Sequence, residues 1–177
     1  AIYGGFNGTD SMLSQRNWIA NVTTLNGEID QNASVTNNSY HVLVGSGTNN
    51  SAVLDGFTVS GGNANGGGTN NNGGGLVNIT GSPTLRNLKF TANFSTTAGA
   101  AIQNFTSSPV ILNTTFISNT SSLVGGAINA EVGSNLTLKN CDFISNVGTI
   151  NGGAMSVSQS NPVFLDCRFI GNTSQEG

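Results

Sequence analysis

The sequence predicts an all-β fold, a right-handed single-stranded parallel β-helix (β-solenoid) with rungs of about 26 residues. Three observations predict it: short apolar runs recur at a constant period, Gly- and Asn-rich turns separate them, and helical patterns with capping signals are missing. Such a unit closes by stacking each strand on its copy in the next unit, parallel and about 4.8 Å away. Crossovers between parallel strands are nearly always right-handed, which sets the expected hand of the coil.

An aromatic column and an Asn column carry the repeat. The Phe residues stand 26, 27 and 26 residues apart, and an Asn follows each of them three residues later. The two columns are Phe90, Phe116, Phe143 and Phe169, and Asn93, Asn119, Asn146 and Asn172. We expect the rings to stack inside the coil. We expect the Asn residues at turns, where Asn tolerates the left-handed conformation and its amide bonds to the copies above and below.

A Gly-rich motif alternates with the Phe and Asn columns, at residues 73–76, 99–102, 125–128 and 152–155. A parallel coil buries its inner face along its whole length, so the aligned apolar residues predict two further core ladders. These are Leu76, Ile102, Ile128 and Met155, and Leu85, Ile111, Leu138 and Phe164. We expect two or three strands of four to six residues in each rung. A column of Pro83, Pro109, Leu136 and Pro162 then marks the first residue of one strand.

The whole chain, 1–177, reads as one β-helix region taken from a longer protein. We expect irregular N-terminal rungs at residues 1–50 and regular repeats at residues 51–177. A degenerate copy at 54–59 precedes its counterpart by 31 residues, and the extra length falls in a Gly/Asn-rich tract at 61–74, which predicts a loop. His41, the single histidine, is expected at a strand surface or edge.

The composition excludes several partners. Charged residues make up 7% of the chain and the net charge is −3, which argues against nucleic-acid binding and against a polybasic membrane patch. No stretch is apolar for long enough to predict a transmembrane helix.

The Phe-x-x-Asn and Gly-Gly-Ala-Ile motifs together resemble the repeat signature of the polymorphic outer membrane proteins and of other bacterial surface proteins with parallel β-helix repeats. The first motif matches at all four copies and the second at 125–128, whereas 152–155 ends in Met and 99–102 has Ala for Gly. Residues 2–6, 16–18 and 25–29 look like the usual start of such regions.

The resemblance implies a non-enzymatic structural or adhesive region of a secreted or cell-surface protein. Its implied location is extracellular, on a bacterium. The implied partners are a protein or glycan surface ligand, or further copies of the solenoid.

A carbohydrate-active β-helix is the alternative function. Such enzymes need clustered carboxylates, either as general acid and base or as calcium ligands. No two acids stack within the repeats, so no catalytic or cofactor-binding residue is assigned there. Glu28, Asp30 and Asp55 remain as candidate calcium ligands or catalytic acids, unless the catalytic rungs lie elsewhere.

Two polar pairs should lie side by side on neighbouring rungs. Asp142 and Arg168 share a column just before the Phe residues and predict an exposed ion pair. Cys141 and Cys167 share a column that alternation places inside. The spacing of rungs permits a disulfide, but stacked Cβ atoms lie further apart than the bond prefers. We therefore expect two buried free thiols that serve core packing.

Overall fold

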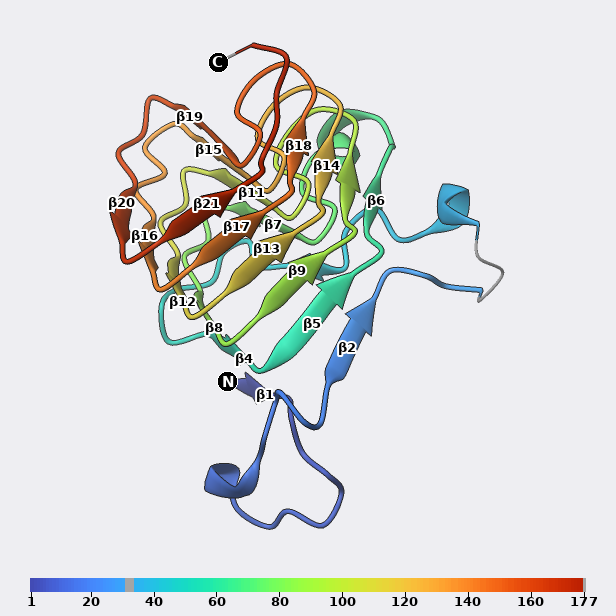
Figure 1. Cartoon of the computed structure of the whole chain (residues 1–177), viewed down its shortest axis with the longest axis vertical. Coiled ribbons are helices and arrows are strands. Elements are labelled where there is room, and N and C mark those ends of the chain that lie inside the picture. Colours follow the sequence, from blue (N-terminus) through green and yellow to red (C-terminus); the bar gives the residue numbers. More distant parts are fainter. Residues whose placement is uncertain (31–33, 177) are drawn as a thin grey trace.

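The computed structural model describes residues 1–30 and 34–176 and shows a parallel β-solenoid with four sheets. Every pair of neighbouring strands in these sheets is parallel and in register (Figure 1). The chain passes from left to right along the near face in Figure 1 while it climbs from the N-terminal to the C-terminal rung. The coil is therefore right-handed, as expected.

Four short strands form each regular rung, and each belongs to a different sheet. Sheet A contains β1 (Ile2–Tyr3), β4 (Val53–Asp55), β8 (Thr84–Arg86), β12 (Val110–Leu112), β16 (Thr137–Lys139) and β20 (Val163–Leu165). Sheet B contains β2 (Thr23–Asn26), β5 (Phe57–Ser60), β9 (Lys89–Thr91), β13 (Thr115–Ile117), β17 (Asp142–Ile144) and β21 (Arg168–Ile170).

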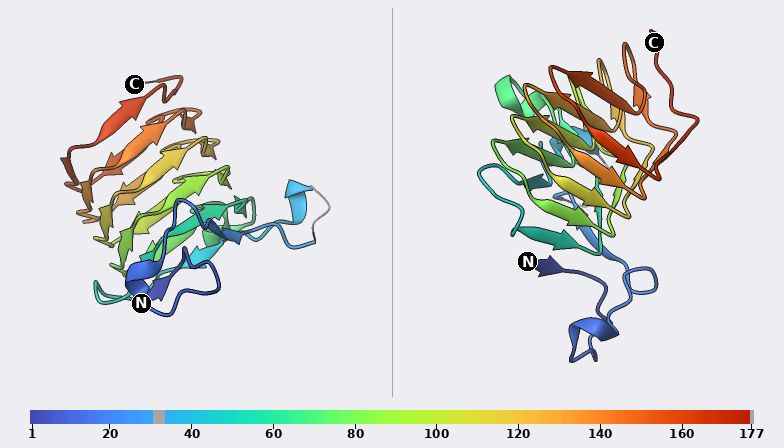
Figure 2. Two further views of the ribbon diagram at one scale, coloured as in Figure 1. Left: turned by 60° about the horizontal axis from the view of Figure 1, so that its bottom comes forward. Right: turned by 90° about the vertical axis from the view of Figure 1, so that its left-hand side faces the viewer.

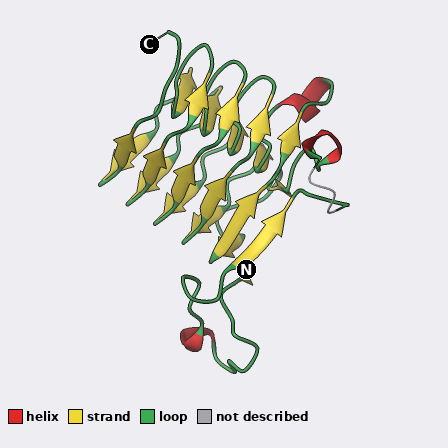
Figure 3. Cartoon of the chain, turned by 45° about the vertical axis from the view of Figure 1, so that its right-hand side comes forward, coloured by secondary structure: helices red, strands yellow, loops and turns green. Residues whose placement is uncertain are grey.

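Sheets C and D complete the rung. Sheet C contains β3 (Leu43–Val44), β7 (Leu76–Ile79), β11 (Ile102–Phe105), β15 (Ile128–Glu131) and β19 (Met155–Ser158). Sheet D contains β6 (Asn63–Ala64), β10 (Phe94–Ser95), β14 (Thr120–Ser121) and β18 (Val147–Gly148). The described residues also form 3-10 turns, namely η1 (Leu13–Gln15), η2 (Val35–Asn37) and η3 (Gly68–Asn71) (Figure 3). In the described part of the chain no helix has the length and apolarity needed to cross a bilayer.

The expectation of two or three strands of four to six residues per rung is wrong, because each rung bends at four corners. From Gly73 onward, one residue at every corner has a φ between 48° and 64°, the left-handed region. At three of the four corners this residue directly follows a strand of three or four residues and ends it. These residues are Gly73, Gly99, Gly125 and Gly152; Thr80, Thr106, Val132 and Gln159; Asn87, Asn113, Asn140 and Asp166; and Ala92, Ser118, Ser145 and Gly171.

Glycine is required at the first of these corners. A Cβ at Gly125 would lie 2.4 Å from the carbonyl oxygen of Ile128, and Gly99 and Gly152 meet the same obstacle. The Asn93 column does not itself take the left-handed conformation, contrary to expectation; the residue before each of these Asn does. The bend thus comes first, and the Asn side chain that follows it is free to enter the stack.

The predicted ladders stack as expected and are buried, except on the last rung, where Phe164 is 39% exposed and Phe169 is 50% exposed. Neighbouring rings of the Phe column stack with centroids 5.3, 4.8 and 4.7 Å apart and interplanar angles of 12° or less. The Leu76 and Leu85 columns pair residue for residue across the rungs, as the sequence alignment places them. Phe116 and Phe143 are completely buried, and so are Ile111 and Ile128. The core therefore runs along the axis of the coil, enclosed by all four sheets.

The Asn column forms a buried hydrogen-bonded ladder. The Nδ2 group of Asn93 donates to Oδ1 of Asn119 over 3.0 Å, and Asn119 and Asn146 repeat this contact to the next rung over 3.0 and 2.9 Å. Each Oδ1 also accepts a backbone N–H, and Asn119 Nδ2 donates to the carbonyl oxygen of Phe90. One side chain thereby satisfies main-chain groups that the bend leaves unpaired.

The N-terminal part joins the solenoid through three short strands. β1 continues sheet A, β2 continues sheet B and β3 continues sheet C, and the segment that carries η1 projects below the first rung (Figure 2). The 61–74 tract is more ordered than the loop predicted from its composition. It contains β6, which pairs with β10, and η3. The column of Pro83 stands immediately before strands β8, β12, β16 and β20 of sheet A rather than at their first residues.

Candidate functional site

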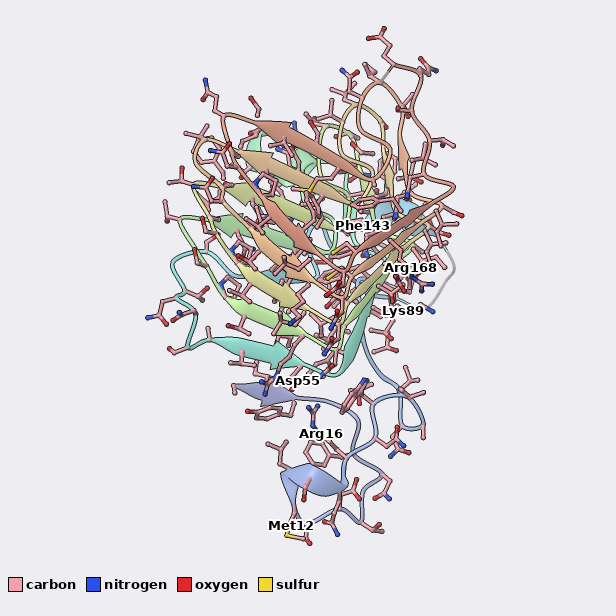
Figure 4. The ribbon with its side chains drawn as sticks, turned by 60° about the vertical axis from the view of Figure 1, so that its left-hand side comes forward. Met12, Arg16, Asp55, Lys89, Phe143 and Arg168 are labelled. Carbon is pink, nitrogen blue, oxygen red and sulfur yellow. The ribbon has the colours of Figure 1, made fainter. Side chains whose placement is uncertain are left out.

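A charged cluster with two ion pairs surrounds Asp55, at the end of β4. Arg16 Nη2 and Arg86 Nε each donate to Oδ2 of Asp55 over 2.6 Å, and Asn87 Nδ2 donates to Oδ1 over 2.8 Å. Figure 4 shows Arg16 between the N-terminal segment and Asp55. Burial raises the pKa of the Asp55 carboxyl, but the hydrogen bonds from Arg16, Asn87 and Arg86 outweigh it and leave the pKa below its ordinary value.

Two aromatic rings hold the Arg16 guanidinium in place. Its Cζ lies 5.2 Å from the ring centroid of Tyr3 and 4.9 Å from that of Trp18, which are cation–π distances. The Arg16 side chain is 8% exposed and that of Asp55 is 1% exposed. The cluster therefore fastens the N-terminal segment to the first rungs of the solenoid.

The calcium interpretation of Glu28, Asp30 and Asp55 gains no support from the geometry. Within residues 1–30 and 34–176 no three His, Cys, Asp or Glu side chains lie close enough together to hold a metal ion. Both oxygens of Asp55 accept hydrogen bonds, and two of the three donors are guanidinium groups, which remove its attraction for a cation. Asp30 instead accepts a hydrogen bond from the side-chain amide of Asn37.

The ion pair predicted between Asp142 and Arg168 is confirmed. The two residues are register partners on β17 and β21, and Arg168 Nε and Nη2 each donate to one oxygen of Asp142 over 2.7 Å. Hydrogen bonding to Arg168 lowers the pKa of Asp142. The Arg168 side chain is 67% exposed, so this ion pair lies on the outer face of sheet B and contributes little to the stability of the fold.

Both cysteines are free, as expected, although only Cys141 is fully buried and Cys167 is half-buried. The Cys141 thiol lies 3.6 Å from the carbonyl oxygen of Ile111, and burial raises its pKa to about 12. His41 is half-buried just before β3, and its Nδ1 lies 3.0 Å from the carbonyl oxygen of Gly73. None of these side chains forms a nucleophile–base pair with another.

A groove that the sequence analysis missed lies on the outer face of sheet B. It has a volume of about 360 Å³ and is bounded on one side by the N-terminal segment and on the other by strands β5, β9 and β13. Its exposed or half-buried lining residues are Trp18, Ile19, Val22, Thr58, Asn87, Lys89, Asn113 and Thr115. The repeat aligns the residues from the solenoid, but no spacing in the sequence places Trp18 beside them.

Comparisons with protein-family models, with characterised proteins and with solved structures gave no match.

Proposed function

We propose that this chain is a non-enzymatic structural or adhesive repeat region of a secreted or cell-surface bacterial protein, akin to the polymorphic outer membrane proteins. The observation that carries the proposal is that the buried side chains serve to hold neighbouring rungs together. The Phe, apolar and Asn columns all serve the stacking of one rung on the next. What remains for contact with partners is a long outer surface that is sparsely charged and carries both polar and apolar side chains.

The distribution of acids supports a scaffold over a polysaccharide enzyme. Asp55 and Asp142 are each held by arginine. Glu131 lies apart from them on β15, where it accepts a hydrogen bond from Asn129. A hydrolase or lyase of this architecture would need two or more carboxylates facing one groove.

Surface exposure is the direct test. Intact cells of the organism that produces the protein are treated with a protease and then stained with an antibody raised against this chain. We expect staining of untreated cells and its loss after the protease, with a cytoplasmic marker unaffected. Staining only after lysis would contradict the proposal.

The enzymatic alternative has its own test. The purified chain is incubated with neutral and acidic polysaccharides, with and without Ca²⁺, and new reducing ends and unsaturated products are measured. We expect no release above that of a heat-denatured sample. Release that disappears in Glu28→Gln or Asp30→Asn would establish the carbohydrate-active alternative.

A further inference from the structure

The groove on sheet B offers apolar side chains, hydrogen-bonding groups and one positive charge. The N-terminal segment supplies an exposed aromatic residue, Trp18, and two exposed aliphatic residues, Ile19 and Val22. The solenoid supplies the hydroxyl groups of two threonines, the amides of two asparagines and the amine of Lys89. A volume of about 360 Å³ lies within the range of small-molecule sites, about 300–1,000 Å³.

Lys89 provides a positive charge that is not neutralised within the described chain. Of the five Lys and Arg residues, the three arginines pair with Asp55 or Asp142, whereas no carboxylate among the described residues lies within 4 Å of the Lys89 amine. Its register partners in sheet B are Thr58 and Thr115. An anionic group in the groove would therefore meet an exposed ammonium flanked by two threonines.

The amides of the groove are held in fixed orientations. Asn113 Nδ2 donates to Oδ1 of Asn87 over 3.2 Å, and Asn87 Nδ2 donates in turn to Asp55. A primary amide has two N–H donors, and these contacts use one of each. Both residues line the groove, and the second N–H of each amide donates to no acceptor among the described residues.

Trp18 is positioned before any ligand arrives. The guanidinium carbon of Arg16 lies 4.9 Å from the centroid of the Trp18 ring. The Trp18 backbone packs closely on Gly5, since a Cβ added to this glycine would lie 2.7 Å from the Trp18 Cα. The side chain nevertheless keeps 36% of its surface exposed. A fixed, exposed aromatic side chain stacks well on the C–H face of a sugar ring, because such a ring is apolar on its faces and polar at its edge.

We propose that this groove binds a saccharide unit that carries an anionic substituent, either a carboxylate or a sulfate. The ring would stack on Trp18, its hydroxyls would bond to Asn87, Asn113 and the threonines, and its anionic group would pair with Lys89. The proposal rests on the adhesive function proposed above. Nucleic acid fits poorly, because a polyphosphate chain would require several cations along its path.

The test uses three oligosaccharides of equal length: a uronic acid oligomer, the same oligomer with its carboxyl groups reduced to alcohols, and a sulfated neutral oligomer. Trp18 is the single tryptophan of the chain, so its fluorescence reports directly on the groove. Calorimetry on the same samples measures the affinity. We expect at least one anionic oligomer to bind with a change in fluorescence, and the reduced oligomer to bind at least about tenfold more weakly.

Matched variants identify the site. Lys89→Gln is expected to lower the affinity for the anionic oligomer by about tenfold and to leave that for the reduced oligomer unchanged. Lys139→Gln is the control, since Lys139 is an exposed lysine on sheet A that makes the same change in net charge. Trp18→Phe should retain part of the affinity. Trp18→Ala should remove it, with circular dichroism checking that each variant is folded.

Three results would overturn the inference: no anionic oligomer binds, Lys139→Gln weakens binding as much as Lys89→Gln, or the reduced oligomer binds as tightly as the acidic one. Preference for the sulfated or the uronic oligomer decides between the two sources of charge. Surface staining without saccharide binding would refute this inference alone, whereas binding by a protein confined to the cell interior would refute the proposed function.

Discussion

At the scale of single residues, the sharpest constraint is the left-handed conformation at every corner. Glycine and asparagine occupy many of these positions at low cost, but Val132, at the end of β15, has a φ of 51°. A β-branched residue is strained there, because its side chain crowds the backbone. The corner is nevertheless kept, since the Val132 N–H donates to the carbonyl oxygen of Ser158 on the next rung over 3.1 Å.

Replacing this valine should stabilise the protein. Val132→Asn relieves the strain, because asparagine adopts the left-handed region readily, and we expect the free energy of unfolding to rise by about 1 kcal/mol. Denaturant unfolding measures the change. Val157→Asn is the control: Val157 is 44% exposed against 42% for Val132, but it lies in strand β19, where asparagine is disfavoured. Stabilisation by both variants would show that the effect is unrelated to the corner.

The two cysteines should differ in reactivity. Burial raises the pKa of Cys141 to about 12, so at neutral pH its thiol is protonated and enclosed, whereas Cys167 is half-buried. We expect an alkylating reagent to modify Cys167 alone in the folded protein, and both residues after unfolding without reductant. Peptide mass spectrometry locates the label. Equal labelling of the two thiols in the folded state would contradict the packing described for Cys141.

At the scale of elements, the ladders determine which changes the solenoid tolerates. A ring in the middle of the Phe stack contacts a ring above and a ring below, while the outer faces of the same rungs carry apolar residues that contact little. The Asn ladder is the polar counterpart of the Phe stack. Its side-chain amides form hydrogen bonds with the equivalent amides on the neighbouring rungs.

Phe116→Ala should reduce the free energy of unfolding by about 3–5 kcal/mol, because it removes a completely buried ring and leaves a cavity between Phe90 and Phe143. Phe105→Ala is the matched control on β11, since that ring is 41% exposed, and we expect it to cost less than about 1 kcal/mol. Chemical denaturation of both variants gives the comparison. Equal costs would mean that the Phe column is not the core of the coil.

At the scale of the whole molecule, the Asp55 cluster joins two parts that the repeat does not join. Arg16 comes from the N-terminal segment, and Asp55 and Arg86 come from neighbouring rungs. The same contact places Trp18 against sheet B and so forms one wall of the groove. Loss of this carboxylate should therefore affect both stability and the groove.

Asp55→Asn should cost about 3–5 kcal/mol at neutral pH, because it leaves the largely buried Arg16 without its counter-ion. The pKa of Asp55 is lower in the folded than in the unfolded chain, so its stabilisation is complete above the unfolded value of about 4. It is lost as the pH falls through the folded value. The difference between wild type and Asp55→Asn should therefore shrink below about pH 4.

Unfolding at a series of pH values measures this difference. Asp142→Asn serves as the control, since its exposed pair with Arg168 should be worth at most about 1 kcal/mol. A difference between wild type and Asp55→Asn that stays constant down to pH 2 would contradict the assignment.

The solenoid, its ladders and its register could all be predicted from the amino-acid sequence. A period of 26–27 residues aligns each Phe, Asn and Leu with its copy, and a parallel stack leaves such aligned residues no other place than one above another. The pairing of Asp142 with Arg168 followed from that register alone. The four-cornered rung did not follow, because left-handed corners are occupied here by residues as different as Gly, Thr, Val and Ala.

The contacts made outside the repeat could not be predicted in this way and became visible in the folded chain. Asp55 was a candidate calcium ligand in the sequence, and folding surrounds it with Arg16, Arg86 and Asn87, which come from 39 and 31–32 residues away. The groove beside it depends on Trp18, in a segment with no copy elsewhere in the chain. A repeat predicts contacts between equivalent positions. The position of a segment that has no copy in the chain depends on the charged groups and surfaces that it contacts in the folded protein. The period of the repeat contains no information about these contacts.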